Sequence, residues 1–259
     1  MARTLTLAAA TLAFAGLSAP AFADIVTKAV EYDVGGTAYE GYFAINDAAG
    51  DDQPLVVIVH DWDGLTDYEM RRAEMLAELG FAAFAIDAYG KGVRPTTLDD
   101  KKAESGRLYK DRELFRERLM GGLKAATGMD GVDDEDVVVI GYCFGGAAAL
   151  EMARAGADAE GFVTFHGGLG TPEGQDYSEV DAPILILHGS ADPAAPMSQV
   201  AELVAAMDEA DVDFEVQLYS GARHSFTEWS AKGDTSQYDA VADRKSWQAL
   251  IGFLNERIR

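Results

Sequence analysis

The stretch Gly141-Tyr142-Cys143-Phe144-Gly145-Gly146 decides the fold of this 259-residue chain, and it holds the only cysteine. The apolar run Val137-Val138-Val139-Ile140 precedes it and is typical of a buried strand. The alanine-rich run 147–153 follows it and favours a helix. Cys143 therefore falls on a turn between a strand and a helix. This is the setting of a nucleophile elbow, with sulfur in place of the usual serine oxygen.

Two glycines frame this turn. Gly141 and Gly145 lie two residues either side of Cys143, where side chains would collide as the chain reverses. A cysteine at the start of a helix also meets the positive end of the helix dipole, which favours the thiolate. The alternative is that a single cysteine is a small buried apolar residue. The glycine frame favours a nucleophile.

A base and an orienting acid follow in the order nucleophile, acid, histidine. The apolar strand 183–187 leads into the polar loop His188-Gly189-Ser190-Ala191-Asp192, in which Asp192 is the candidate carboxylate. The strand 214–219 leads into a loop that carries His224, the candidate base. For the other histidines, which also end predicted strands, we expect structural or pocket-lining roles: His60, His166 and His188. No pair of histidines has metal-ligand spacing, so we predict no metal site.

The whole chain alternates between strand and helix patterns, which favours a mostly parallel sheet with helices on both faces. Residues 24–259 suit a single domain. The expected strands are 25–33, 37–45, 55–60, 81–86, 136–141, 161–166, 183–188 and 213–219, and the expected helices are 67–79, 98–126, 144–155, 196–210 and 237–258. The candidate residues then lie on loops at the carboxyl edge of the sheet, where open α/β sheets bind ligands.

The chain resembles the dienelactone hydrolase family over essentially all of residues 24–259, and five motifs, taken in order, carry the resemblance. They are His60-Asp61-Trp62-Asp63-Gly64-Leu65, Ile86-Asp87-Ala88-Tyr89-Gly90-Lys91-Gly92, the cysteine elbow, His188-Gly189-Ser190-Ala191-Asp192 and Arg223-His224-Ser225-Phe226-Thr227. The resemblance implies an α/β-hydrolase fold and a triad of Cys143, Asp192 and His224. It also implies hydrolysis of carboxylic esters or lactones through an acyl-enzyme, without a cofactor.

The resemblance assigns two further roles near the nucleophile. Family members have an acidic residue after the first central strand that controls the ionisation of the thiol, and Asp61 stands at that position where glutamate is expected. The alternative is that Asp61 caps the following helix. The backbone N–H groups of Trp62 and Phe144 are expected to form the oxyanion hole.

Substrate contacts are expected from residues that follow the strands. The candidates are His60, Tyr89, Tyr142, Phe226 and Glu228, and each aromatic is open to the alternative of core packing. Members that act on dienelactones hold the substrate carboxylate with arginines, one of them four residues beyond the histidine. Glu228 occupies that position here, and a glutamate repels an anionic substrate. The sequence therefore does not favour dienelactone itself.

The first 23 residues predict export. Arg3 precedes an apolar stretch that is too short for a membrane span, and Ala21-Phe22-Ala23 fits a signal peptidase site before Asp24. The alternatives are an uncleaved anchor or a buried helix. We expect a periplasmic or secreted protein, in which an unpaired thiol requires a reason such as catalysis.

The chain is strongly acidic, with a net charge of −23 that becomes −24 when Arg3 is removed. This charge argues against nucleic acid and anionic membranes as partners. The acidic run 130–136 lacks the spacing of a calcium loop and is expected to be a solvated loop. We expect a monomer or a weak homodimer that binds a small ester or lactone. Two other functions are consistent with the same residues: an acyltransferase, and a non-catalytic exported binding protein.

Overall fold

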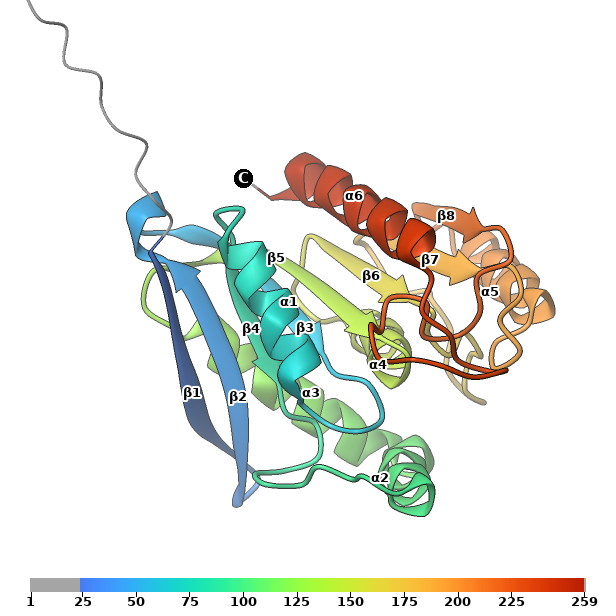
Figure 1. Ribbon diagram of the computed structural model, residues 1–259, viewed down its shortest axis with the longest axis horizontal. Coiled ribbons are helices and arrows are strands. Elements are labelled where there is room, and N and C mark those ends of the chain that lie inside the picture. Colours follow the sequence, from blue (N-terminus) through green and yellow to red (C-terminus); the bar gives the residue numbers. More distant parts are fainter. Residues whose placement is uncertain (1–23, 259) are drawn as a thin grey trace, which may run out of the picture.

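An eight-stranded sheet runs through residues 24–258, the part of the chain that the computed structural model describes (Figure 1). The strands are β1 (Ile25–Val34), β2 (Thr37–Asn46), β3 (Gln53–Val59), β4 (Ala82–Ile86), β5 (Val132–Tyr142), β6 (Gly161–Phe165), β7 (Ile184–Gly189) and β8 (Phe214–Tyr219). The helices are α1 (Asp67–Ala77), α2 (Leu98–Lys110), α3 (Arg112–Thr127), α4 (Phe144–Arg154), α5 (Met197–Glu209) and α6 (Ala240–Arg257), with a short 3-10 turn at Asp47–Ala49.

The strand order is β1-β2-β4-β3-β5-β6-β7-β8. The first two strands form a hairpin whose second strand pairs antiparallel with β4, and the remaining pairs are parallel. Residues 55–59 of β3 are completely buried, as expected for a parallel strand covered on both faces. The predicted α/β-hydrolase fold, a mostly parallel sheet with helices on both faces, is confirmed.

The helices divide the core into two apolar layers. In Figure 1 α1 and α6 lie over the near face of the sheet, where Leu76 and Leu250 belong to one cluster. Helices α3, α4 and α5 cover the other face and contribute Phe115, Leu150 and Leu203 to the second cluster. Within residues 24–258, no helix combines the length and the apolar character that crossing a membrane requires.

Two of the predicted boundaries are wrong. The single helix predicted over 98–126 is two helices, because Asp111 leaves the helical conformation and caps α3 by accepting a hydrogen bond from the Leu114 N–H at 3.0 Å. The acidic run predicted as a loop includes the start of β5, which pairs with Gln53 and Pro54 of β3 before a register shift. A bulge of this kind interrupts an otherwise regular pattern, and the apolar periodicity gives no sign of it.

The elbow depends on close backbone contacts. Cys143 has a φ of 53°, a left-handed conformation that costs a non-glycine residue free energy. A Cβ atom on Gly145 would lie 2.0 Å from the carbonyl oxygen of Val59, and one on Gly141 would lie 1.9 Å from the carbonyl oxygen of Gly145. Both glycines are therefore required for helix α4 to start against the end of β3.

We predict that Gly145→Ala destabilises the protein by about 3 kcal/mol, because the atoms that it meets are backbone and cannot move aside. The matched control is Gly252→Ala in α6, where a Cβ meets nothing within 4 Å. That change should stabilise the protein by about 0.5 to 1 kcal/mol. Urea unfolding of both variants measures the difference, and equal midpoints would contradict the prediction.

Candidate active site

Three predicted residues from distant parts of the chain meet at the carboxyl edge of the sheet. The Nε2 atom of His224 lies 3.0 Å from the Sγ atom of Cys143. The Nδ1 atom of the same ring lies 2.8 Å from Oδ2 of Asp192. Cys143 follows β5, Asp192 follows β7 and His224 follows β8. The geometry is that of a nucleophile, a base and an orienting carboxylate in hydrogen-bonded series.

The surroundings of Asp192 favour its charged form. Burial alone would raise the pKa of this carboxyl, but the hydrogen bond and charge of His224 lower it, and the net direction is downward. Oδ1 also accepts hydrogen bonds from the N–H groups of Ala194 at 2.8 Å and Ala195 at 3.1 Å. A carboxylate fixed in this way holds the imidazole in the tautomer that has its proton on Nδ1. Nε2 is then free to accept the thiol proton.

The thiol itself differs from the expectation based on the helix dipole. Burial raises the pKa of Cys143 well above its usual range, and the neighbouring carboxyl of Asp61 raises it further. The backbone N–H of Phe144, which hydrogen-bonds to the sulfur, lowers the pKa but does not outweigh these effects. The protonated thiol is therefore the resting form.

Asp61 contacts both the sulfur and one of the two amides predicted to form the oxyanion hole. Its carboxyl hydrogen-bonds to the thiol of Cys143 and also accepts the backbone N–H of Trp62. Burial, followed by the charges of Asp63 and Glu69, raises the pKa of Asp61 well above its usual range. Both amides predicted to stabilise an oxyanion are thus near the sulfur, and each already has an acceptor in this structure. Direct contact between Asp61 and Cys143 is present although the side chain is one methylene shorter than glutamate.

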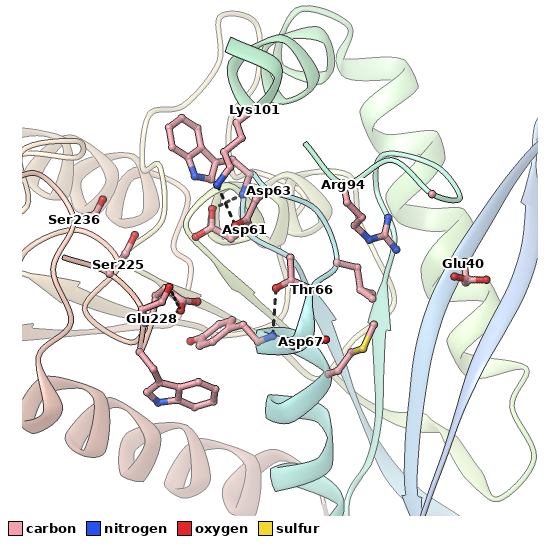
Figure 2. Close-up of a pocket in the computed structure, with 18 residues that line it drawn as sticks. Glu40, Asp61, Asp63, Thr66, Asp67, Arg94, Lys101, Ser225, Glu228 and Ser236 are labelled. Atoms are coloured by element: carbon pink, nitrogen blue, oxygen red, sulfur yellow. Dashed lines mark hydrogen bonds and ion pairs between the residues drawn. The ribbon is translucent and has the colours of Figure 1, made fainter. Parts of the chain in front are cut away.

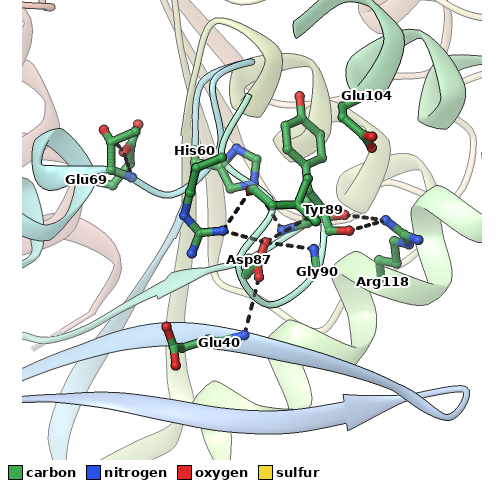
Figure 3. A network of polar contacts seen from close by, with 12 residues as sticks. Glu40, His60, Glu69, Asp87, Tyr89, Gly90, Glu104 and Arg118 are labelled. Carbon is green, nitrogen blue, oxygen red and sulfur yellow. Dashed lines mark hydrogen bonds and ion pairs between the residues drawn. The ribbon is translucent and has the colours of Figure 1, made fainter. Parts of the chain in front are cut away.

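His60 and Tyr89, which lie beside Asp87 in Figure 3, hold the backbone of the loop that carries Asp61 and Trp62. The Nε2 atom of His60 accepts the Ala88 N–H at 3.0 Å, so its Nδ1 carries the proton and donates to the Asp61 carbonyl at 2.6 Å. The Tyr89 hydroxyl donates to the Trp62 carbonyl at 3.1 Å. The side chains of His60 and Tyr89 therefore join the carboxyl end of β4 to this loop.

A small apolar pocket opens at the sulfur and has a volume of about 330 Å³. Ser105 and Tyr109 of α2 form part of its wall, together with Trp62, Phe144 and Ala195. Apart from Cys143 and His224, its lining residues carry no ionisable group except the Tyr109 phenol. This pocket suits an uncharged group of modest size.

Four of the five residues predicted to contact substrate lie in the core instead: His60, Tyr89, Tyr142 and Phe226. The reason is aromatic packing. The ring of Tyr142 stacks on Phe165 at 4.6 Å between centroids, and Phe226 packs edge-on against His166 at 5.1 Å. A residue at a strand end can point into the sheet layer as readily as toward solvent.

The fifth, Glu228, lines a wider groove of about 940 Å³ beside the pocket (Figure 2). We call this the acidic groove, because five acids and two bases line it: Glu40, Asp61, Asp63, Asp67 and Glu228, with Arg94 and Lys101. Both bases are already paired, Lys101 with Asp63 at 3.2 Å and Arg94 with Asp87 at 3.6 Å. The groove therefore offers no free cation to an anionic ligand.

A model of the dienelactone hydrolase family matches residues 39–258, which is most of the chain. This protein belongs to the dienelactone hydrolase family. A carboxymethylenebutenolidase of Pseudomonas putida is 26% identical over 197 residues, covering 74% of this chain and 83% of that protein. The crystal structure of a dienelactone hydrolase-like promiscuous phosphotriesterase from metagenomic libraries is 33% identical with a TM-score of 0.86, covering 91% of this chain and 99% of the other. Esterase 2 of Thermogutta terrifontis, 20% identical with a TM-score of 0.60, shows the fold alone.

Membership confirms the prediction of a hydrolase that acts on esters or lactones. The roles of individual residues in this family member stay predictions. Within residues 24–258, no three His, Cys, Asp or Glu side chains are grouped as metal ligands would be.

The sequence did not reveal a cluster of buried polar residues that holds the loop after His224 in place. Arg72 of α1 is 2% exposed, binds Asp243 of α6 at 2.6 Å and donates to the Thr227 carbonyl at 3.1 Å. The Thr227 hydroxyl bonds Tyr68 at 2.7 Å and His166 at 2.8 Å. These contacts join residues 155 and 171 positions apart, so no local pattern could have found them.

We predict that Asp61→Asn makes Cys143 more reactive at neutral pH, because it removes a carboxyl that opposes the thiolate. The pH midpoint for alkylation by iodoacetamide, followed by intact mass, should fall by about one unit. Asp63→Asn, whose carboxyl has a weaker effect on the thiol, should give a smaller shift. An unchanged or higher midpoint in Asp61→Asn would show that this carboxyl does not control the sulfur.

Proposed function

We propose that this protein is an exported cysteine hydrolase of uncharged carboxylic esters or lactones, acting through an acyl-enzyme. The observation that carries the proposal is the series Cys143, His224 and Asp192, with heteroatom distances of 3.0 and 2.8 Å. Family membership supports the ester or lactone class, and the apolar pocket at the sulfur supports an uncharged acyl group.

The chemistry begins from the neutral thiol. As the sulfur attacks the carbonyl carbon, the thiol proton passes to Nε2 of His224, and Asp192 stabilises the imidazolium that forms. The oxyanion accepts hydrogen bonds from the N–H groups of Phe144 and Trp62. These groups must first give up their present acceptors, which are the sulfur for Phe144 and the Asp61 carboxyl for Trp62. His224 then protonates the leaving alcohol, and water, deprotonated by His224, attacks the thioester and releases the acid.

This mechanism favours esters over amides. A thiolate leaves a tetrahedral intermediate more readily than an amine does, so an amide substrate would return to the starting state. Activated esters and enol lactones carry better leaving groups and proceed to the acyl-enzyme.

Charge narrows the substrate further. The walls of the pocket carry no lysine or arginine, and the two bases of the acidic groove are paired. Placing a carboxylate there would leave it without a partner in a region of negative charge. The proposal is therefore for neutral substrates, which excludes an anionic dienelactone as the natural one.

Export is proposed from the leader alone, which lies outside the described residues. The properties of the thiol suit an oxidising compartment, because a thiol with a raised pKa forms little thiolate and resists oxidation. Expression of the full chain in a bacterial host, followed by mass measurement of the periplasmic fraction, tests it. A mature protein beginning at Asp24 is the expected product, and a cytoplasmic protein that retains residues 1–23 would contradict export.

The first prediction concerns the acyl-enzyme. Mixed with p-nitrophenyl acetate, the mature protein should show a transient adduct of one acetyl group and continued release of nitrophenol, whereas Cys143→Ala should show neither above background. Intact-mass spectrometry and absorbance measure the two together. A stable adduct without turnover would favour the acyltransferase, and no adduct would favour the binding protein.

The second prediction concerns charge. The value of kcat/KM for p-nitrophenyl butyrate should exceed that for mono-p-nitrophenyl succinate by at least about tenfold, because the acyl chains are similar in size and differ by one unpaired carboxylate. Glu228→Gln should narrow the difference by removing one negative charge from the acidic groove. Equal values for the two esters in the wild-type protein would contradict a neutral substrate class.

A further inference from the structure

Glu69 is a completely buried carboxyl that none of the steps above uses. It lies in the first turn of α1, and its exposed fraction is 0%. A buried carboxylate is costly unless its oxygens accept hydrogen bonds. Its two oxygens have separate partners.

One oxygen of Glu69 holds the start of the helix. Oε2 accepts the backbone N–H and the hydroxyl of Thr66, both at 2.9 Å, which completes a capping box. The other oxygen, Oε1, leaves the helix and accepts the backbone N–H of Asp61 at 3.2 Å. Asp61 is the residue that contacts the sulfur, and the next amide is the Trp62 N–H.

We propose that Glu69 is a positioning residue for the reaction: its carboxylate ties the loop carrying Asp61 and Trp62 to the first turn of α1. The carbonyls of this loop are held by His60 and Tyr89, and Glu69 holds the N–H side that those residues leave free. The peptide planes on both sides of Asp61 are thereby fixed. The proposal rests on the proposed function, because the Trp62 amide matters only if an oxyanion forms.

The local charges make this tie depend on pH. Burial raises the pKa of Glu69 to about 7, with Asp63 adding to the effect and the Thr66 hydrogen bonds opposing it. The titratable groups that face it are Asp61 and Asp63 of the loop and the Tyr142 hydroxyl of β5. Above pH 7 the bond to the Asp61 N–H is charge-assisted, and below pH 7 it becomes a weaker neutral bond.

The kinetic test compares Glu69→Ala and Glu69→Gln with wild type on p-nitrophenyl acetate. In Glu69→Ala the loop carrying Asp61 and Trp62 loses its tie to α1 and the Trp62 N–H is displaced. This change should lower kcat at least about tenfold while KM changes less than about twofold. Glutamine presents one acceptor instead of two and should give a smaller loss. The matched control is Asn46→Ala, which removes the cap of the 3-10 turn Asp47–Ala49 at the amino edge of the sheet, opposite the site, and should reduce stability alone.

The pH profile separates positioning from a structural role. The ratio of wild-type to glutamine kcat should rise as pH increases through about 7, because only wild type gains the charged acceptor. The stability of wild type relative to Glu69→Gln should change in the opposite direction. Below pH 4.5 Glu69 is protonated in the folded and in the unfolded protein. Between pH 4.5 and 7 only the unfolded protein loses this proton, which lowers the free energy of unfolding as pH rises. The Tm of wild type should therefore fall relative to that of Glu69→Gln over this window.

Hydrogen exchange tests the tie without any turnover. The Asp61 amide should exchange at least about tenfold faster in Glu69→Ala than in wild type, with no such change in Asn46→Ala. If wild type hydrolyses no ester but this difference appears, the proposed function fails and the tie stands. The proposal would be overturned if Glu69→Ala kept the kcat of wild type, if Asn46→Ala lost as much kcat as Glu69→Ala, or if exchange at the Asp61 amide were unchanged in Glu69→Ala.

Discussion

The close approach of Gly145 to the end of β3 is the constraint on which the site depends. Because no side chain separates them, helix α4 begins directly against the carbonyls of Val59 and His60. This contact places the strained Cys143 beside the loop that leaves β3, and so beside the carboxyl of Asp61. This one backbone contact therefore brings together the Cys143 sulfur, the Asp61 carboxyl that raises its pKa, and the amides of Trp62 and Phe144.

A neutral thiol at rest gives the site a consistent chemistry. Burial and Asp61 oppose the thiolate, while Asp192 holds His224 with Nε2 directed at the sulfur. In the proposed mechanism, the proton leaves as the sulfur attacks a carbonyl carbon and the resulting oxyanion accepts hydrogen bonds from the two amides. Because a thiol with a raised pKa forms little thiolate, the same arrangement also limits oxidation of the unpaired Cys143.

Two buried charged residues of α1 fix loops beside the site. Arg72 joins α1 and α6 to the loop after His224, and Glu69 joins α1 to the loop that carries Asp61 and Trp62. Helix α1 thus contacts both sides of the site through two residues three positions apart. Each has several hydrogen-bond partners, which reduce the cost of burying its charge.

The sequence by itself determined the strand and helix alternation, the cysteine elbow and the order of Cys143, Asp192 and His224, because each depends on a local pattern of apolar runs, glycines and loop residues. It did not determine the break at Asp111, since a helix cap inside a helical pattern is indistinguishable from an exposed aspartate. Only the tertiary structure decided which residues form the pocket walls and which lie in the core. It also decided that the thiol is neutral, because a pKa depends on burial and on neighbouring charges, and chain folding alone brings those together.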